Sequence, residues 1–260
     1  MIDGAETLES DDRATIGALA DELRDADSAV ALTGAGVSTA SGIPPFRGED
    51  GIWNTDFDPA AFHITRFERD PAGFWADRIK LYDRMYPESV DPNPAHDALA
   101  RLESIGSLDA VITQNTDGLH AEAGSEAVIE LHGTNNRVVC HHCGERAAAG
   151  PIRNRVADGE RPPRCEDCGG VFKPDVVLFG ELLDRKALRR AKELVADSDL
   201  LIVAGSSLTV DPAGSLPAER RGGSLAIVNF DRTPFDDSAE FLLQADLTIV
   251  LPALVDAIDR

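Results

Sequence analysis

The chain has 260 residues, 43% of them hydrophobic and 27% charged, which is enough for one large domain or for a large and a small one. It contains 46 Asp and Glu against 25 Lys and Arg, so its formal net charge is -21. This excess repels phosphate backbones and argues against a direct nucleic-acid ligand, whereas a basic peptide would be attracted. Because the acidic residues are not gathered into one run, they indicate a solvated surface that suits high internal salt.

The N-terminal stretch "MIDGAETLESDD" has neither a basic start nor an apolar segment, so it does not predict a secretory signal. The longest uninterrupted apolar runs, such as Leu200–Ala204, are far too short to span a bilayer. We therefore expect a soluble, cytoplasmic protein with no membrane partner.

Buried strands alternate with helices along most of the chain. Apolar residues from Ile16 to Leu23 have helical spacing, and "SAVALTGAGVS" is an apolar run that breaks into glycines, which predicts a strand and a tight turn into a helix. Five further strands are predicted at Ala110–Thr113, Ala127–Leu131, Leu200–Gly205, Leu225–Phe230 and Leu247–Leu251. Their continuous apolar character, with a helical pattern from Leu188 to Val195 between two of them, indicates a doubly wound, parallel, Rossmann-like α/β sheet.

Two segments interrupt this pattern. Residues from about 48 to 94 look helical and irregular, and residues from about 136 to 173 carry all four cysteines. We expect both to be insertions that together form a smaller lobe, with the large lobe built from about 1–47, 95–135 and 174–260. Ligands would bind between the lobes, at the carboxyl ends of the strands.

The cysteines form two CxxC pairs, which favours metal over a disulfide framework. Two such turns can close a tetrahedral four-thiolate zinc site, and with no open position the ion would be structural. Redox pairs or buried free thiols are the alternatives. The predicted ligands are Cys140, Cys143, Cys165 and Cys168.

Polar side chains cluster directly after the predicted strands. In "GAGVSTASGIPPFRG" the glycines at 34 and 36 would let the backbone approach a pyrophosphate, although a plain strand-to-helix turn would need them too. "TQNTDGLH" places Asn115 and Asp117 after a strand, where they could also simply cap a helix. His132 follows the next strand and could be a general base or a satisfied turn residue. His63 and His96 are expected to be structural.

These motifs, together with "ELHG", "KPDVVLFGE", "GSSLTV" and "VN", occur in the order seen in sirtuins, which the chain resembles from about Ala29 to its C-terminus. Sirtuins are NAD-dependent protein lysine deacylases. One departure is Pro45, where many sirtuins have Asp. The resemblance implies a Rossmann-like lobe with a zinc-ribbon lobe, an acylated lysine on a protein as substrate, and nicotinamide and O-acyl-ADP-ribose as products.

The resemblance also implies a role for individual residues. His132 would be the general base, His120 would support the site from beneath, and one zinc ion per chain would hold the small lobe together. The implied NAD-binding residues are Gly34, Ala35, Gly36, Ser38, Ile43, Phe46, Arg47, Gln114, Asn115, Asp117, Gly205, Ser206, Ser207, Asn229, Phe230, Asp231 and Ala245. The implied peptide- and acyl-binding residues are Val177, Phe179, Gly180, Glu181 and Arg78.

The segment "GFWADRIK" bears on which acyl group is preferred. Sirtuins that prefer succinyl or malonyl groups have a Tyr and an Arg three residues apart here, and this chain has Trp75 and Arg78. Arg78 could instead be a surface residue paired with nearby acids. We expect acetyl-lysine to be preferred. Two other functions stay open: an ADP-ribosyltransferase that uses the same NAD site, and a non-catalytic zinc-ribbon module, which the net charge disfavours as a nucleic-acid binder.

Overall fold

The computed structural model describes residues 8–46, 51–54, 57–86 and 90–260. Within these ranges, no helix combines the length and the apolar character that crossing a membrane requires. Arg47, a predicted NAD contact, lies outside the described residues.

The larger of two sheets is parallel throughout and has the order β3-β2-β1-β7-β8-β9. Its strands are β1 (Ala29–Thr33), β2 (Ala110–Thr113), β3 (Val128–Glu130), β7 (Leu200–Ala204), β8 (Ser224–Val228) and β9 (Phe241–Leu243). Every residue of β1, β2 and β7 is buried, because helices cover both faces. The strands that follow β1 in sequence, β2 and β3, lie on one side of it, and β7, β8 and β9 lie on the other. The carboxyl end of β1 is therefore a topological switch point.

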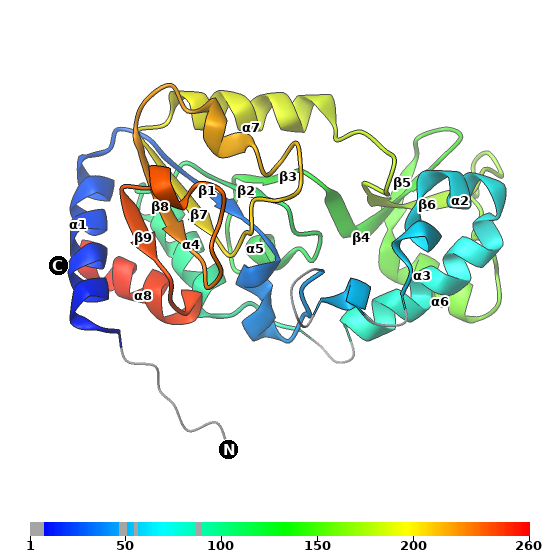
Figure 1. Ribbon diagram of the computed structural model, residues 1–260. Coiled ribbons are helices and arrows are strands. Elements are labelled where there is room, and N and C mark those ends of the chain that lie inside the picture. Colours follow the sequence, from blue (N-terminus) through cyan, green and yellow to red (C-terminus); the bar gives the residue numbers. More distant parts are fainter. Residues whose placement is uncertain (1–7, 47–50, 55–56, 87–89) are drawn as a thin grey trace, which may run out of the picture.

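Two layers of helices enclose this sheet (Figure 1). Helices α1 (Ser10–Asp25), α4 (Pro94–Ser104) and α8 (Leu247–Ile258) share one hydrophobic cluster with it. Helix α7 (Arg185–Asp197) and the 3-10 helix η4 (Leu216–Glu219) contribute to a second cluster, with the alternate side chains of the same strands. The doubly wound fold predicted from the sequence is confirmed.

The strand predicted at Leu247–Leu251 is wrong, since this segment forms the first turns of α8. Asp246 caps that helix by accepting a hydrogen bond from the Thr248 backbone N–H. The sixth strand is instead β9, only three residues long. A short apolar run cannot be assigned to strand or helix from periodicity alone, and here the aspartate before the run was the deciding signal.

The smaller sheet is antiparallel, with the order β5-β4-β6, from β4 (Gly133–Cys140), β5 (Arg146–Ala148) and β6 (Phe172–Val176). It shares a third hydrophobic cluster with side chains of helices α2 (Ile64–Arg69), α3 (Pro71–Met85) and α6 (Ala149–Ala157). The short elements are α5 (Leu119–Glu122) and the 3-10 helices η1 (Ala35–Ser41), η2 (Ile52–Asn54), η3 (Pro59–Phe62) and η5 (Asp236–Ser238). The lobe boundaries stay a prediction.

Candidate active site

The glycine turn after β1 packs directly on the turn after β7. The backbone N–H of Gly36 donates to the carbonyl oxygen of Gly205 at 2.8 Å. A Cβ on Gly34 or on Gly36 would lie 2.8 Å from that same carbonyl oxygen, and Gly205 itself has a φ of 62°. Only glycine allows the two backbones to approach this closely. The turn after β1 is therefore a bare stretch of main chain at the switch point.

Gln114 connects three strand ends of the large sheet. It follows β2, and its side-chain amide donates to Ser206 Oγ, after β7, at 2.8 Å. The backbone carbonyl oxygen of Gln114 lies 2.8 Å from Nδ1 of His132, which follows β3. A carbonyl only accepts, so Nδ1 carries the proton and Nε2 holds the lone pair of the neutral ring. His132 is thus fixed in the tautomer that a general base at Nε2 needs.

Ser38 brings Asn115 and Asp117 together with the glycine turn. Its hydroxyl donates to Asp117 Oδ2 at 2.8 Å and accepts from the Asn115 amide at 3.0 Å. Asp117 Oδ1 also accepts from the Leu119 N–H at 3.0 Å, so it caps a turn and joins the cluster at the same time. Asp117 thus closes a turn before α5, whereas the NAD-binding role of "TQNTDGLH" stays a prediction.

Two buried histidines lie beneath this cluster with their rings 4.9 Å apart. His96 Nδ1 accepts from the Asn93 N–H, so its Nε2–H points to Ser38 Oγ at 3.4 Å. His120 Nε2 lies 2.9 Å from Thr33 Oγ1. Burial lowers the pKa of His96, and burial together with His96 lowers the pKa of His120 to about 3. Both rings are neutral at pH 7 and support the site from below.

His96 was expected only to begin a helix, and it does so in a capping box with Asn93. Its contact with Ser38 was missed. The two residues are far apart in sequence, and no periodic pattern or motif spacing links them. The only available signal was a histidine at a helix start after two prolines, in "PNPAH", which is too common to be informative.

The four cysteine sulfurs all lie within 4.8 Å of one another. Cys140 Sγ and Cys168 Sγ are 3.5 Å apart, and Cys143 Sγ and Cys165 Sγ are 3.9 Å apart. A tetrahedral ion with Zn–S bonds of about 2.3 Å separates its ligands by roughly 3.8 Å, so the four sulfurs fit zinc. Burial raises the pKa of Cys140, but the backbone N–H groups of Cys143 and His142 help to lower it to about 6.

The predicted peptide-binding segment begins beside the candidate base. The Val177 N–H donates to the His132 carbonyl oxygen at 2.9 Å, and the Phe179 carbonyl accepts from Ile64 N–H at 2.9 Å. Glu181 accepts from Leu178 N–H and from Lys173 Nζ, each at 2.8 Å. The segment is thus held at both ends, while Phe179 and Gly180 are exposed.

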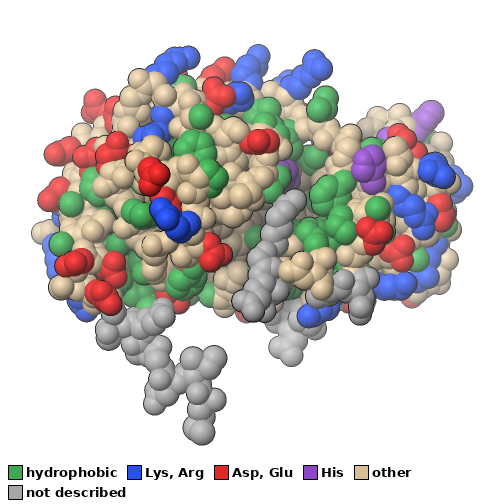
Figure 2. Space-filling view, viewed as in Figure 1, with side chains coloured by type: hydrophobic (Ala, Val, Ile, Leu, Met, Phe, Trp, Pro, Cys, Tyr) green, Lys and Arg blue, Asp and Glu red, His purple; other side chains and the backbone are tan. Residues whose placement is uncertain are grey.

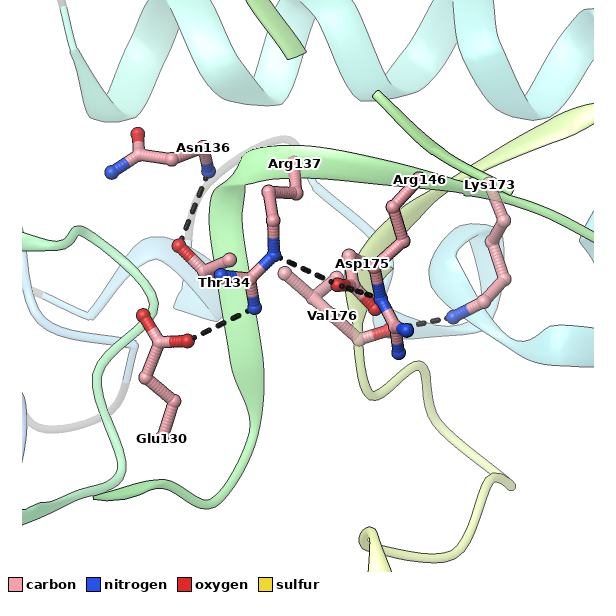
Figure 3. A network of polar contacts seen from close by, with 8 residues as sticks. All are labelled: Glu130, Thr134, Asn136, Arg137, Arg146, Lys173, Asp175 and Val176. Atoms are coloured by element: carbon pink, nitrogen blue, oxygen red, sulfur yellow. Dashed lines mark hydrogen bonds and ion pairs between the residues drawn. The ribbon is translucent and has the colours of Figure 1, made fainter. Parts of the chain in front are cut away.

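An ion network ties the two sheets together near His132 (Figure 3). Arg137 of β4 donates to Glu130 of β3 at 3.2 Å and to Asp175 of β6 at 3.1 Å. Arg146 of β5 donates to the same Asp175 oxygen at 3.2 Å. Figure 3 also shows Lys173 reaching the Val176 carbonyl, which anchors the start of the peptide-binding segment. Three strands of the small sheet are therefore linked electrostatically to the end of β3.

Arg78 is not an ion-paired surface residue, so that alternative is wrong. Its guanidinium donates to Asn135 Oδ1, and no described carboxylate forms an ion pair with it. Burial lowers its pKa to about 10. Asn135 donates in turn to Tyr86 and to Thr116 Oγ1, at 3.2 and 2.8 Å. Trp75 is buried, and its ring N–H donates to the Phe172 carbonyl at 2.8 Å.

The remaining predicted NAD contacts fall into two groups: Ile43 and Phe46 belong to the hydrophobic cluster of the small sheet, and the others lie in turns of the large sheet. Ile43 is buried, and Phe46 stacks on Trp53 with ring centroids 5.7 Å apart. Asn229 follows β8 and donates to the Asp231 carbonyl at 2.7 Å, while Phe230 is 59% exposed. Ser207 and Asp231 are exposed, Ala35 and Ala245 are half-buried. Leu208, in the turn after β7, is the one non-glycine residue among those described with a positive φ, 55°.

Comparison with known proteins places the chain in a family. A model of the Sir2 family matches residues 34–212. An NAD-dependent protein deacetylase of Haloarcula marismortui is 53% identical, over 98% of this chain and 99% of its own length. NAD-dependent protein deacylase 2 of Archaeoglobus fulgidus is 42% identical, over 93% of this chain and 95% of its own. A solved Sir2 protein with a p53 peptide and NAD+ is 38% identical with a TM-score of 0.81, covering 92% of this chain and 96% of that one. The chain belongs to the Sir2 family.

Proposed function

We propose that the chain is an NAD-dependent protein lysine deacetylase, which removes acetyl groups from lysine side chains and gives nicotinamide and O-acetyl-ADP-ribose. The observation that carries this proposal is the convergence of four strand ends. The bare glycine turn, the Ser38–Asn115–Asp117 cluster and His132 in its Nδ1–H tautomer meet at the carboxyl edge of one parallel sheet. The names of the two relatives above agree with it.

The donors and acceptors at the switch point suit NAD. Amide and hydroxyl groups, which match a carboxamide and ribose hydroxyls, gather around Asn115, Gln114 and Ser206. We propose that Asn115 and Asp117 hold the nicotinamide end, and that the turns at Gly34–Gly36 and Gly205–Ser207 border the phosphates. Asn229, Phe230 and Asp231 would face the adenosine half. NAD supplies the acceptor ribose and a leaving group that departs as nicotinamide.

The chain's own residues supply proton transfer and alignment. His132 Nε2 accepts a proton from a ribose hydroxyl, while Nδ1–H stays on the Gln114 carbonyl and keeps the ring in place. The neutral pair His96 and His120 holds Ser38 and Thr33 without adding a positive charge next to the departing group. Zinc, bound by the four thiolates, has no part in proton transfer and stabilises the small sheet.

The substrate lies as an extended chain along Val177–Glu181, where main-chain hydrogen bonds give affinity without reading the sequence. The acyl group we propose is acetyl. An acidic acyl group would need a free donor, and the Trp75 N–H is already bound to the Phe172 carbonyl. Arg78 donates to Asn135 Oδ1 and keeps further N–H donors, so only half of an acid-binding pair is present.

A cytoplasmic location and adaptation to high salt are further parts of the proposal. The net charge of -21 and the similarity to a Haloarcula protein support them. We also propose the lobe boundaries near residues 47, 95, 135 and 174, which agree with the separate hydrophobic cluster around the small sheet.

The activity is tested by incubating the purified protein with NAD and an acetyl-lysine peptide, and by following the products with mass spectrometry. We expect deacetylated peptide and O-acetyl-ADP-ribose in equal amounts. Release of nicotinamide with ADP-ribose attached to protein, and no loss of acetyl groups, would instead identify an ADP-ribosyltransferase.

A further inference from the structure

Helix α7 carries a basic face on an otherwise acidic chain. Its sequence, "RKALRRAKELVAD", places five of the chain's 25 Lys and Arg residues within eight positions. Four of them, Arg185, Lys186, Arg189 and Arg190, are exposed on the side opposite the buried Ala191 and Val195, and we call these four the α7 basic face. Figure 2 shows basic side chains projecting along the upper edge of the molecule, where α7 lies in Figure 1.

This face does not stabilise the helix that carries it. Arg185 and Arg189, and likewise Lys186 and Arg190, are like charges four residues apart, which repel each other. They occupy the N-terminal half of the helix, where the helix dipole favours acidic residues. Among the described residues, Arg189 has a distant ion pair with Glu193 at 3.7 Å, and the other three have none.

Several arginines elsewhere in the chain have structural partners. Arg155 forms hydrogen bonds with the Glu160 carboxylate at 2.6 and 2.7 Å, and Arg137 bridges Glu130 and Asp175. Three of the four cations of the α7 basic face form no ion pair with the described residues of a chain that has 46 acidic ones, so they are available to a ligand outside the chain. The opposite charge is what such a surface attracts.

The α7 basic face lies next to the proposed peptide-binding segment. That segment ends at Glu181, and α7 begins at Arg185 after its N-cap, Asp184. Four residues span at most about 14 Å, so the first cations lie within reach of a peptide aligned along Val177–Glu181. Between the two lies Leu182, which is 82% exposed and offers an apolar contact beside the charges.

We propose that the α7 basic face binds acidic residues of the substrate protein, so that acetyl-lysines flanked by Asp and Glu are preferred. This rests on the deacetylase activity proposed above. A polyanion such as DNA fits less well, because the four charges are surrounded by a chain of net charge -21 and adjoin the peptide segment.

The test compares two acetyl-lysine peptides of equal length at low ionic strength, one with Asp and Glu on both flanks and one with Asn and Gln in their place. We expect kcat/KM to be about fivefold higher for the acidic peptide, through KM, and this advantage to shrink as KCl is added. The triple variant Arg185→Gln/Lys186→Gln/Arg189→Gln should lose the advantage and keep its rate on the neutral peptide.

A matched variant, Arg13→Gln/Arg101→Gln/Arg260→Gln, removes three exposed charges from α1, α4 and the C-terminus, and should keep the advantage. Equal rates on both peptides in the wild-type protein would overturn the docking proposal alone, whereas no turnover of either would overturn the deacetylase activity itself. Binding of a labelled acidic peptide, followed by fluorescence anisotropy, provides a readout without NAD. If a DNA duplex competed more tightly than the acidic peptide for the α7 basic face, the proposed partner would be wrong.

Discussion

The two sheets of this molecule obtain their stability in different ways. Strands β1 and β7 are buried along their whole length between two layers of helices. Strand β5 has three residues, none of them buried, and the small sheet ends at a cysteine cluster. The large sheet is held by apolar burial on both faces, whereas the small sheet has a hydrophobic cluster of its own and, in addition, four cysteines that fit a zinc ion. The candidate site lies where the large sheet ends, so its polar groups follow strands that are buried along their whole length.

Charge differs between the same two regions. Residues 136–173 contain seven Lys and Arg against five Asp and Glu, so the rest of the chain has 18 basic residues against 41 acidic ones. The acid excess therefore lies outside the cysteine-bearing segment, in the rest of the chain. Repulsion between acidic side chains destabilises that part of the chain, whereas residues 136–173 are nearly balanced in charge.

The largest expected effect is the loss of the metal. Cys140→Ala removes one of four thiolates, which should cost several kcal/mol of metal-coupled folding free energy, and zinc analysis should fall from about one ion per chain to well below it. Limited proteolysis should then cut within residues 136–173 first. Folded, active wild-type protein that contains no zinc would contradict this account of the small sheet.

Next in size is the loss of the base. His132→Ala should lower kcat by about two to four orders of magnitude, because His132 accepts the ribose proton in the proposed mechanism. NAD binding, measured by calorimetry, should persist, and so should the unfolding temperature. A variant with near-wild-type turnover would remove His132 from the proposed mechanism.

The preference for one acyl group over another tests the contacts that Trp75 and Arg78 make with the small sheet. We expect kcat/KM to be at least about tenfold higher for acetyl-lysine than for succinyl-lysine, since the Trp75 N–H is already bound and a buried carboxylate with only half of its partners is costly. Arg78→Ala should change deacetylation by less than about threefold. A succinyl preference that disappears in this variant would show that Arg78 leaves Asn135 to bind the acid.

The buried histidines predict a pH effect confined to the large sheet. The pKa of His120 is about 3 in the folded chain and about 6.5 when unfolded, so the unfolded state binds the additional proton between these values. The free energy of unfolding should therefore fall as the pH drops below about 6.5, by up to about 1.4 kcal/mol per pH unit. Chemical denaturation at several pH values should show a shallower dependence for His120→Asn.

Salt should produce the smallest and most graded effect. From millimolar to molar KCl, screening should raise the unfolding temperature, and hydrogen exchange should slow more in the large sheet than in residues 136–173. A flat or falling unfolding temperature would leave the acidic composition unexplained.

The sequence predicted the parts of this fold that depend on local pattern. Ala29–Thr33 and Leu200–Ala204 are continuous apolar runs, and the CxxC spacing alone predicted a zinc site. Prediction from the sequence failed at Leu247–Leu251, where an apolar run fits a strand or a helix, and at Phe241–Leu243, where three residues are too few to show a pattern.

The contacts between residues of the candidate site were harder to predict from the sequence. A motif can bring Asn115 and Asp117 to a strand end, but the bonds from Ser38 to Asp117 and from His96 to Ser38 join segments distant in sequence. Such contacts depend on which strands become neighbours. The occupation of Trp75 and Arg78 by Phe172 and Asn135 is equally a product of tertiary packing.

The glycine contact between the turns after β1 and β7 limits how this protein can evolve. Gly34, Gly36 and Gly205 meet backbone to backbone, so an added side chain at one cannot be compensated by shrinking another. A single substitution at any of these three glycines would therefore clash with backbone atoms. We therefore expect a change of cofactor or acyl preference to come from the side chains around the crevice and not from the glycines of the turn.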